Sequence, residues 1–114
     1  MIERSLILVL FLMITATVLA DEGKDLRSIK QQLKNTEAEK EFQKLVSKYH
    51  PYGEIVFDIT VYKKGKVESV FKSSCTITER EFINELINYI KALQFDIKLN
   101  KNQKIKIQYT YLFN

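Results

Sequence analysis

Residues 52–74 constrain the fold more strongly than any other part of this chain, because they have the pattern of one long hairpin. Over residues 54–62 every second side chain is a large apolar one, which is typical of a strand buried on one face. These side chains are Ile55, Phe57, Ile59 and Val61. The run stops at residues 63–66, where Gly65 supplies the positive φ that a short hairpin turn requires. We therefore predict that the chain turns here and returns as a second strand over residues 66–72.

The returning strand is less regular than the first. Val67 and Val70 are an odd number of positions apart, so they share one face only if the strand contains a bulge or a sharp twist. The residues that follow, SSCTI at 73–77, have the composition of a linker. We expect the second strand to carry a bulge or a sharp twist and to end before this linker.

The segment 24–49 contains no Pro or Gly and is rich in helix-forming residues. The stripe of apolar residues is thin in its middle, where Thr36 followed by Glu39 has the form of a helix start. We expect a loose, partly helical leading segment over residues 21–35 and a firmer helix over residues 36–49. The stripe that supports both consists of Leu26, Ile29, Leu33, Phe42, Leu45, Val46 and Tyr49.

A further helix is predicted to begin at Thr78, where Glu81 would complete a capping box. Its apolar residues follow helical spacing and form a stripe wide enough to cover a flat apolar surface. We interpret this stripe as core and not as a cofactor site. Its members are Phe82, Ile83, Leu86, Ile87, Tyr89, Ile90 and Leu93.

The last segment, KIKIQYTYLF at residues 104–113, has the cleanest alternation in the chain. Its apolar face holds Ile105, Ile107, Tyr109, Tyr111 and Phe113, and its polar face holds Lys104, Lys106, Gln108 and Thr110. The elements follow the order helix, strand, strand, helix, strand. We predict an α+β two-layer sandwich with topology α-β-β-α-β, in which a three-stranded antiparallel sheet of order 2-1-3 has its helices on one face.

The N-terminus has the pattern of an export signal. Residues 6–20 are an unbroken run of apolar or small residues, shorter than the roughly 20 that a membrane-spanning helix needs. We predict a signal peptide over residues 1–20, cleaved before Asp21, and a periplasmic or secreted protein. The alternative is that residues 2–20 remain as an inner-membrane anchor, in which case the chain contacts the membrane. The folded domain is expected over residues 36–114.

The ionisable residues predict no catalytic, cofactor or metal site. Cys75 is the single cysteine and His50 the single histidine, too few for a disulfide framework, a zinc site or a triad with a histidine base. We expect a partly buried thiol at Cys75 and an exposed imidazole at His50, which lies beside Pro51 in a turn. The net charge is +4, and the lysines alternate with glutamates without forming the basic run of a nucleic-acid site.

The remaining candidates for catalysis are isolated acids. No two of them have the spacing that general acid–base chemistry requires. We therefore predict that the chain is not an enzyme and binds no cofactor and no nucleic acid. These acids are Asp58, Glu68, Glu79 and Glu81.

One set of glycines, apolar residues and serines has a distinctive spacing. It consists of Gly53, Ile55, Phe57, Ile59, Gly65, Val67, Val70, Ser73, Ser74, the run Ile90 to Phe95, and Tyr111 to Phe113. This spacing resembles that of TonB-type C-terminal domains. It is most similar to the short TonB-like domains at the C-termini of AgmX/PglI-type gliding-motility proteins, and the likeness covers about residues 40–114. The chain differs at Leu93 and Thr110, where the family often has Trp and Pro, and it has one Pro in place of a long Pro-rich spacer.

The resemblance implies a module that binds an extended segment of a protein partner in the cell envelope. The partner would add a strand to the edge of the last strand, centred on Ile107, Gln108, Tyr109 and Thr110. Lysines on this edge would alternatively serve to prevent aggregation. Two further alternatives are a self-associating structural subunit and a membrane-anchored energy transducer. A freely diffusing copy could not transmit force from an inner-membrane motor, so the transducer role requires the retained anchor.

Overall fold

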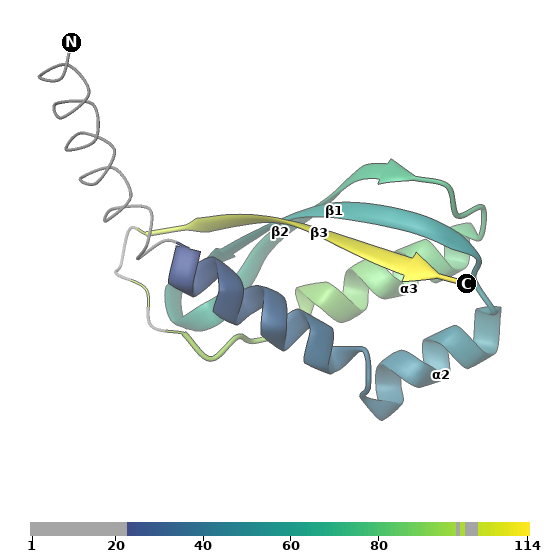
Figure 1. Cartoon of the computed structure of the whole chain (residues 1–114), viewed down its shortest axis with the longest axis horizontal. Coiled ribbons are helices and arrows are strands. Elements are labelled where there is room, and N and C mark those ends of the chain that lie inside the picture. Colours follow the sequence, from purple (N-terminus) through teal and green to yellow (C-terminus); the bar gives the residue numbers. More distant parts are fainter. Residues whose placement is uncertain (1–22, 98, 100–102) are drawn as a thin grey trace, which may run out of the picture.

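The computed structural model describes residues 23–97, residue 99 and residues 103–114 (Figure 1). The predicted signal peptide and the alternative anchor lie outside the described residues. The chain folds as an α+β structure with a three-stranded antiparallel sheet of order β2-β1-β3, and this confirms the predicted fold class. The elements are a leading helix (residues 23–36), α2 (Lys40–Tyr49), β1 (Gly53–Tyr62), a 3-10 turn (Lys63–Gly65), β2 (Lys66–Cys75), α3 (Arg80–Lys91) and β3 (Ile105–Phe113).

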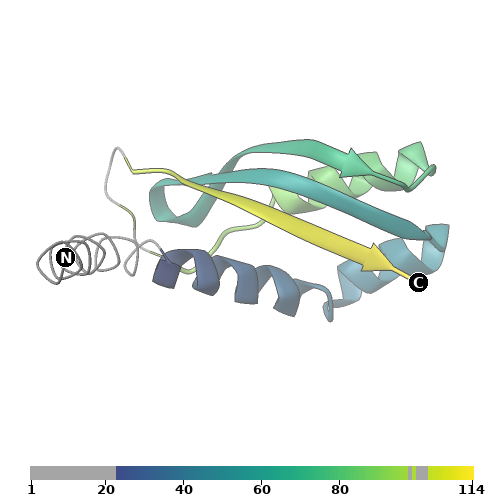
Figure 2. The same cartoon turned by 45° about the horizontal axis from the view of Figure 1, so that its top comes forward.

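The sheet is buried on one face only. Figures 1 and 2 show the helices beneath the same face of the sheet. The alternation of β1 and β3 places their large apolar residues toward the helices, as predicted. Fully buried side chains from both layers meet there, among them Phe57 and Ile59 from β1, Phe82 and Leu86 from α3, and Tyr111 from β3.

The hairpin follows the prediction closely. Gly65 has φ 80°, and the preceding Lys64 is also left-handed at φ 57°. The pairing of β1 with β2 shifts register between Thr60 and Val61 of β1. On β2, opposite this point, the predicted bulge lies between Val67 and Val70. A second shift lies between Val56 and Phe57.

β2 is longer than predicted, because it continues to Cys75 and not to residue 72. The expected linker is therefore wrong for its first three residues. Ser74 pairs with Val56 and Cys75 with Ile55, so the first half of β1 has a partner strand. Serines tolerate this position because β2 lies at the edge of the sheet, where most of its side chains face water.

The leading segment is helical throughout residues 23–36 and is not loose. Ile29 and Leu33 are fully buried, and they belong to the same core as the sheet residues. The Gln32 side chain adds two hydrogen bonds to the backbone of Asp96: Nε2 donates to its C=O (3.3 Å) and Oε1 accepts from its N–H (2.8 Å). The leading helix is thus an integral part of the helical layer.

Both predicted helix starts are displaced. Thr36 ends the leading helix, and its hydroxyl donates to the Leu33 C=O at 2.6 Å. α2 begins after Glu39 and α3 after Glu79, and neither glutamate makes a side-chain capping hydrogen bond. The residues between the leading helix and α2, which we call the elbow (residues 37–39), are held by backbone bonds of the i to i+3 type.

Candidate functional site

The predicted partner site is the open edge of β3. The hydrogen bonds at the start of β1 show which backbone groups of β1 point to β2 and which point to β3. The Glu54 C=O accepts a hydrogen bond from the Thr76 N–H at 2.8 Å, and the Glu54 N–H donates to Thr76 Oγ1 at 2.8 Å. Glu54 therefore turns its backbone toward the β2 side. Because successive residues of an antiparallel strand direct their backbone groups to opposite sides, Ile55, Phe57 and Ile59 direct theirs to β3.

The register of β3 divides the four predicted site residues into two pairs. Tyr109 lies opposite Phe57 and Ile107 opposite Ile59, so both use their N–H and C=O to bind β1. Gln108 and Thr110 direct these groups to the other side. Among the described residues no further strand pairs with β3. The backbone groups available at the open edge are those of Lys106, Gln108, Thr110 and Leu112.

The side chains of these four residues lie on the outer, uncovered face of the sheet. Lys106, Gln108 and Thr110 are exposed, and Leu112 is 60% exposed. Gln108 Nε2 donates to Asp58 Oδ1 on β1 at 3.4 Å. A shallow hollow of about 550 Å³ lies over this part of the sheet, and its lining includes Asp58, Lys106, Gln108 and, from β2, Phe71.

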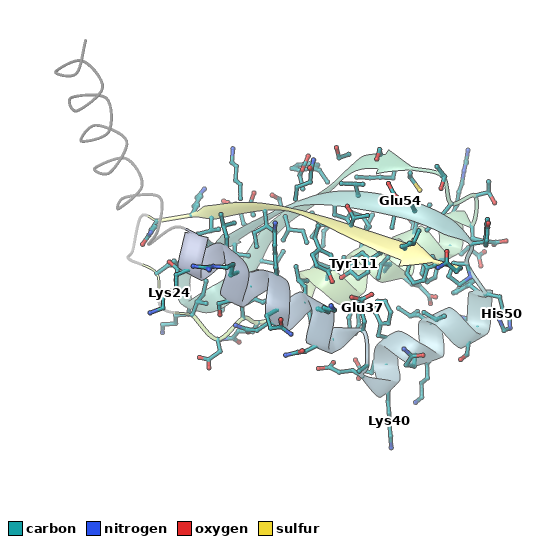
Figure 3. The ribbon with its side chains drawn as sticks, viewed as in Figure 1. Lys24, Glu37, Lys40, His50, Glu54 and Tyr111 are labelled. Atoms are coloured by element: carbon teal, nitrogen blue, oxygen red, sulfur yellow. The ribbon has the colours of Figure 1, made fainter. Side chains whose placement is uncertain are left out.

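On the inner side, tyrosines hold the elbow against the sheet and α3. The Tyr109 hydroxyl donates to Glu37 Oε2 at 2.7 Å, and the Tyr89 hydroxyl donates to Glu39 Oε2 at 2.9 Å. Figure 3 shows Glu37 and Tyr111 near each other, and the Glu37 charge adds to the effect of burial in raising the pKa of Tyr111. The Tyr111 hydroxyl is buried and has no hydrogen-bond partner among the described residues.

These surroundings raise the pKa of three tyrosines above the ordinary value of 10.0. Burial is the main cause for each, since it disfavours the phenolate. For Tyr89, burial and the hydrogen bond to Glu39 raise the pKa to about 12. The pKa of Tyr109 is raised by burial and by Glu37, and that of Tyr111 by burial and by the nearby Tyr109.

We expect the fold to lose stability as the pH rises above about 10. In the unfolded chain the tyrosines ionise near a pKa of about 10, whereas the folded state keeps Tyr89, Tyr109 and Tyr111 protonated beyond it. The folded state then binds more protons, so the free energy of unfolding falls with rising pH. Urea denaturation at several pH values above and below this point measures the slope. Tyr111→Phe should make this slope shallower, because it removes one of the three hydroxyls that stay protonated in the folded state.

The isolated ionisable residues are not brought together. Asp58 contacts Gln108, Glu68 Oε1 pairs with Lys104 Nζ at 2.7 Å, and His50 is exposed at the end of α2. Cys75 is half-buried and free, as predicted, and its Sγ lies 3.4 Å from the Ile77 C=O. Within the described ranges no cluster of three or more His, Cys, Asp or Glu could hold a metal ion.

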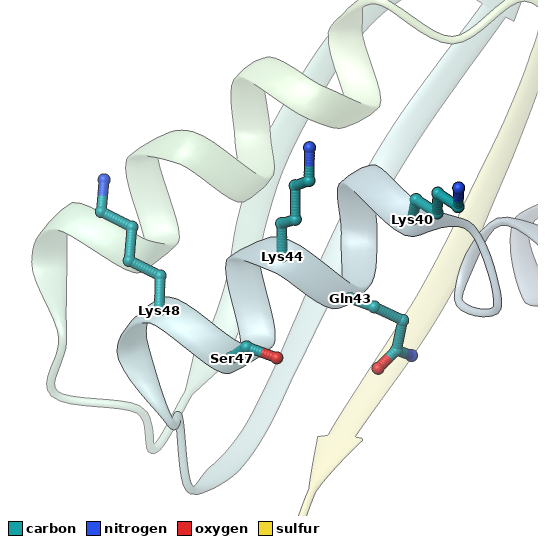
Figure 4. A pocket seen from close by; sticks show the side chains of 5 residues that line it. All are labelled: Lys40, Gln43, Lys44, Ser47 and Lys48. Atoms are coloured by element: carbon teal, nitrogen blue, oxygen red, sulfur yellow. The ribbon is translucent and has the colours of Figure 1, made fainter.

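A row of lysines lies along one side of α2. Lys40, Lys44 and Lys48 lie one turn apart beside a shallow hollow of about 450 Å³, with Gln43 and Ser47 between them (Figure 4). Lys48 Nζ is 3.6 Å from Glu85 Oε1, and it also lies 5.0 Å from the centre of the Tyr49 ring. Long exposed side chains of this kind form an ordinary solvated helix face.

Comparison of the chain with known protein families, curated proteins and solved structures gives no match in any of the three. In the part of the chain that the structure describes, no helix combines the length and apolar character needed to cross a bilayer.

Reasoning from the sequence missed the contribution of the elbow to this site. The sequence predicted that Glu37 lies in the helix over residues 36–49, yet it lies in the elbow, and its carboxylate accepts a hydrogen bond from Tyr109 of β3. A signal was present in the spacing of Leu26, Lys30, Lys34 and Glu37, which places these residues along one side of a helix. The sequence did not reveal which strand this side would meet.

Proposed function

We propose that this chain is an exported, non-catalytic protein-binding module of TonB-like fold. It engages an extended segment of a cell-envelope protein, which adds a strand to the open edge of β3. One observation carries this proposal: the backbone groups of Lys106, Gln108, Thr110 and Leu112 point away from β1 at the end of the sheet. An incoming strand can bind them without displacing any helix or strand among the described residues.

The TonB-like likeness receives support from the positions of two glycines. Gly53 and Gly65, which belong to the motif that carries the resemblance, have φ 123° and 80°. Both values lie in the region that favours glycine over other residues. The placement of the last strand at the edge of the sheet agrees with the role that the resemblance implies for it.

Strand addition can be tested by removing a single backbone donor. Gln108→Pro deletes an N–H that points to the open edge and takes no part in pairing with β1, and proline is tolerated at such edge positions. We expect this variant to fold and to lose partner binding. The measurement is titration of isotope-labelled protein with an extract of its own cell envelope, observed through the amide signals of residues 105–111.

Two controls accompany this variant. Gln108→Ala keeps the backbone N–H and should retain binding. This control separates the effect of losing the side chain from the effect of losing the backbone N–H. Ile107→Pro removes an N–H that pairs with β1 and a buried side chain, so it should destabilise the fold. If Gln108→Pro binds as well as the unaltered chain, or if no amide of residues 105–111 responds to the extract, strand addition at this edge is wrong.

Self-association through the same edge is the alternative function. The open backbone groups of β3 could pair with those of a second copy. A single monomer mass at high micromolar concentration would exclude it. The energy-transducing role is a further alternative that needs residues 2–20 as an anchor, and the mass of the exported protein tests whether they are retained.

A further inference from the structure

Two lysines of the leading helix belong to a stripe that follows β3. One end of the stripe is Leu26, which lines a hollow of about 360 Å³ together with Ile105 at the start of β3. The other end is Glu37, which accepts the hydrogen bond from Tyr109 in the middle of β3. Lys30 and Lys34 fall between them at spacings of four and three residues, so they lie on the same side of the helix.

This side of the leading helix lies toward the open edge of β3. The opposite flank is occupied by Gln32, which binds the backbone of Asp96 in the segment after α3. Figures 1 and 2 both show the leading helix running alongside β3, below the sheet. Lys30 and Lys34 are exposed. They therefore flank the open edge from the helical side.

Lys106 flanks the same edge from the outer face of the sheet. It is exposed and belongs to the residues whose backbone groups point to the open edge. The ion pairs found among the described residues are Lys48–Glu85 and Lys104–Glu68. Lys30, Lys34 and Lys106 thus have no carboxylate at ion-pair distance within the described part, and the open edge lies between positive charges on two sides.

We propose that the partner segment is acidic and carries carboxylates on both of its faces. Side chains of a strand alternate between faces, so consecutive acidic residues would direct some carboxylates toward Lys106 and others toward Lys30 and Lys34. This proposal rests on strand addition to β3 and specifies the chemistry of the added strand. Complementary charge speeds the association of such a partner. It also disfavours basic segments, because they would place like charges next to one another.

The test uses two acetylated and amidated octapeptides of β-forming composition. One has four consecutive glutamates flanked by valine and threonine, and the other has glutamines in place of the glutamates. We expect the glutamate peptide to bind on the order of tenfold more tightly at low salt, since each exposed ion pair contributes about twofold to fivefold. The shifted amides should include Lys106, Gln108 and Thr110, and the preference should weaken as salt is added.

Matched variants distinguish binding at the open edge of β3 from nonspecific attraction of an acidic peptide to a basic protein. Lys30→Gln combined with Lys34→Gln should reduce binding of the glutamate peptide by about fivefold or more. The control combines Lys40→Gln with Lys44→Gln, which removes the same charge from two exposed lysines one turn apart on α2, and it should change nothing.

Each contrary result has a distinct meaning. Equal binding of the two peptides along β3 would overturn the acidic preference and leave strand addition intact. An equal loss of affinity in the α2 control, or amide shifts outside β3, would show nonspecific charge attraction and overturn the proposal. If neither peptide binds, the acidic preference is wrong, and the envelope titration of Gln108→Pro decides strand addition separately.

Discussion

Gly65→Ala is expected to unfold a large fraction of the protein, with a loss of about 3 kcal/mol or more in the free energy of unfolding. A Cβ at Gly65 would lie 1.8 Å from the Phe95 carbonyl oxygen, and the residue has φ 80°. The backbone cannot easily move apart, because the Phe95 N–H donates to the Gly65 C=O at 2.8 Å. Steric overlap and left-handed strain therefore act together.

Urea denaturation of both proteins under the same conditions measures this loss. The matched control is Gly23→Ala, where an added Cβ meets nothing within 4 Å and the residue is helical. We expect this control to be neutral or to stabilise the fold by up to about 1 kcal/mol. A Gly65→Ala protein as stable as the control would mean that the hairpin turn does not pack against the segment around Phe95.

Leu33→Ala is expected to destabilise the protein by about 3 kcal/mol, a large part of the roughly 5 to 15 kcal/mol available to a domain of this size. Leu33 lies on the leading helix and is fully buried in the common core. Truncating it leaves a cavity between the helical layer and the sheet. The change in the midpoint of urea denaturation, at constant slope, gives the loss.

Its control is Lys34→Ala on the exposed side of the same helix, which should alter stability by less than about 0.5 kcal/mol. This pair of variants tests whether the leading helix belongs to the folded domain. A loss below about 1 kcal/mol for Leu33→Ala would indicate that the helix detaches at little cost. It would also remove the helical flank of the open edge of β3, on which the acidic partner depends.

The strands could be predicted because their burial pattern is local. In β1 and β3 the period of two identifies the buried face directly, and Gly65 marks the turn between β1 and β2. The sheet order followed from the helix that joins β2 to β3. α3 was equally clear, because Phe82, Leu86 and Ile90 repeat at helical spacing.

The remaining features depend on contacts between distant parts of the chain. The Tyr109–Glu37 hydrogen bond links residues 72 positions apart, and no local pattern predicts that an exposed-looking glutamate has this partner. The serines of β2 look like a linker, yet Ser74 pairs with Val56 across the hairpin, on the side of β1 opposite to β3. Capping boxes were predicted at Thr36 and Thr78, but α2 and α3 begin after Glu39 and Glu79. The Thr36 hydroxyl instead donates to the Leu33 C=O of the preceding helix.

The two hydrogen bonds between Gln32 and Asp96 join residues 64 positions apart, which has a consequence for how the protein acquires its fold. A polypeptide emerges from the ribosome with its N-terminal end first. Gln32 can form these hydrogen bonds only after Asp96 has been synthesised. Docking of the leading helix against this segment therefore depends on a contact of long sequence separation, and such contacts slow folding.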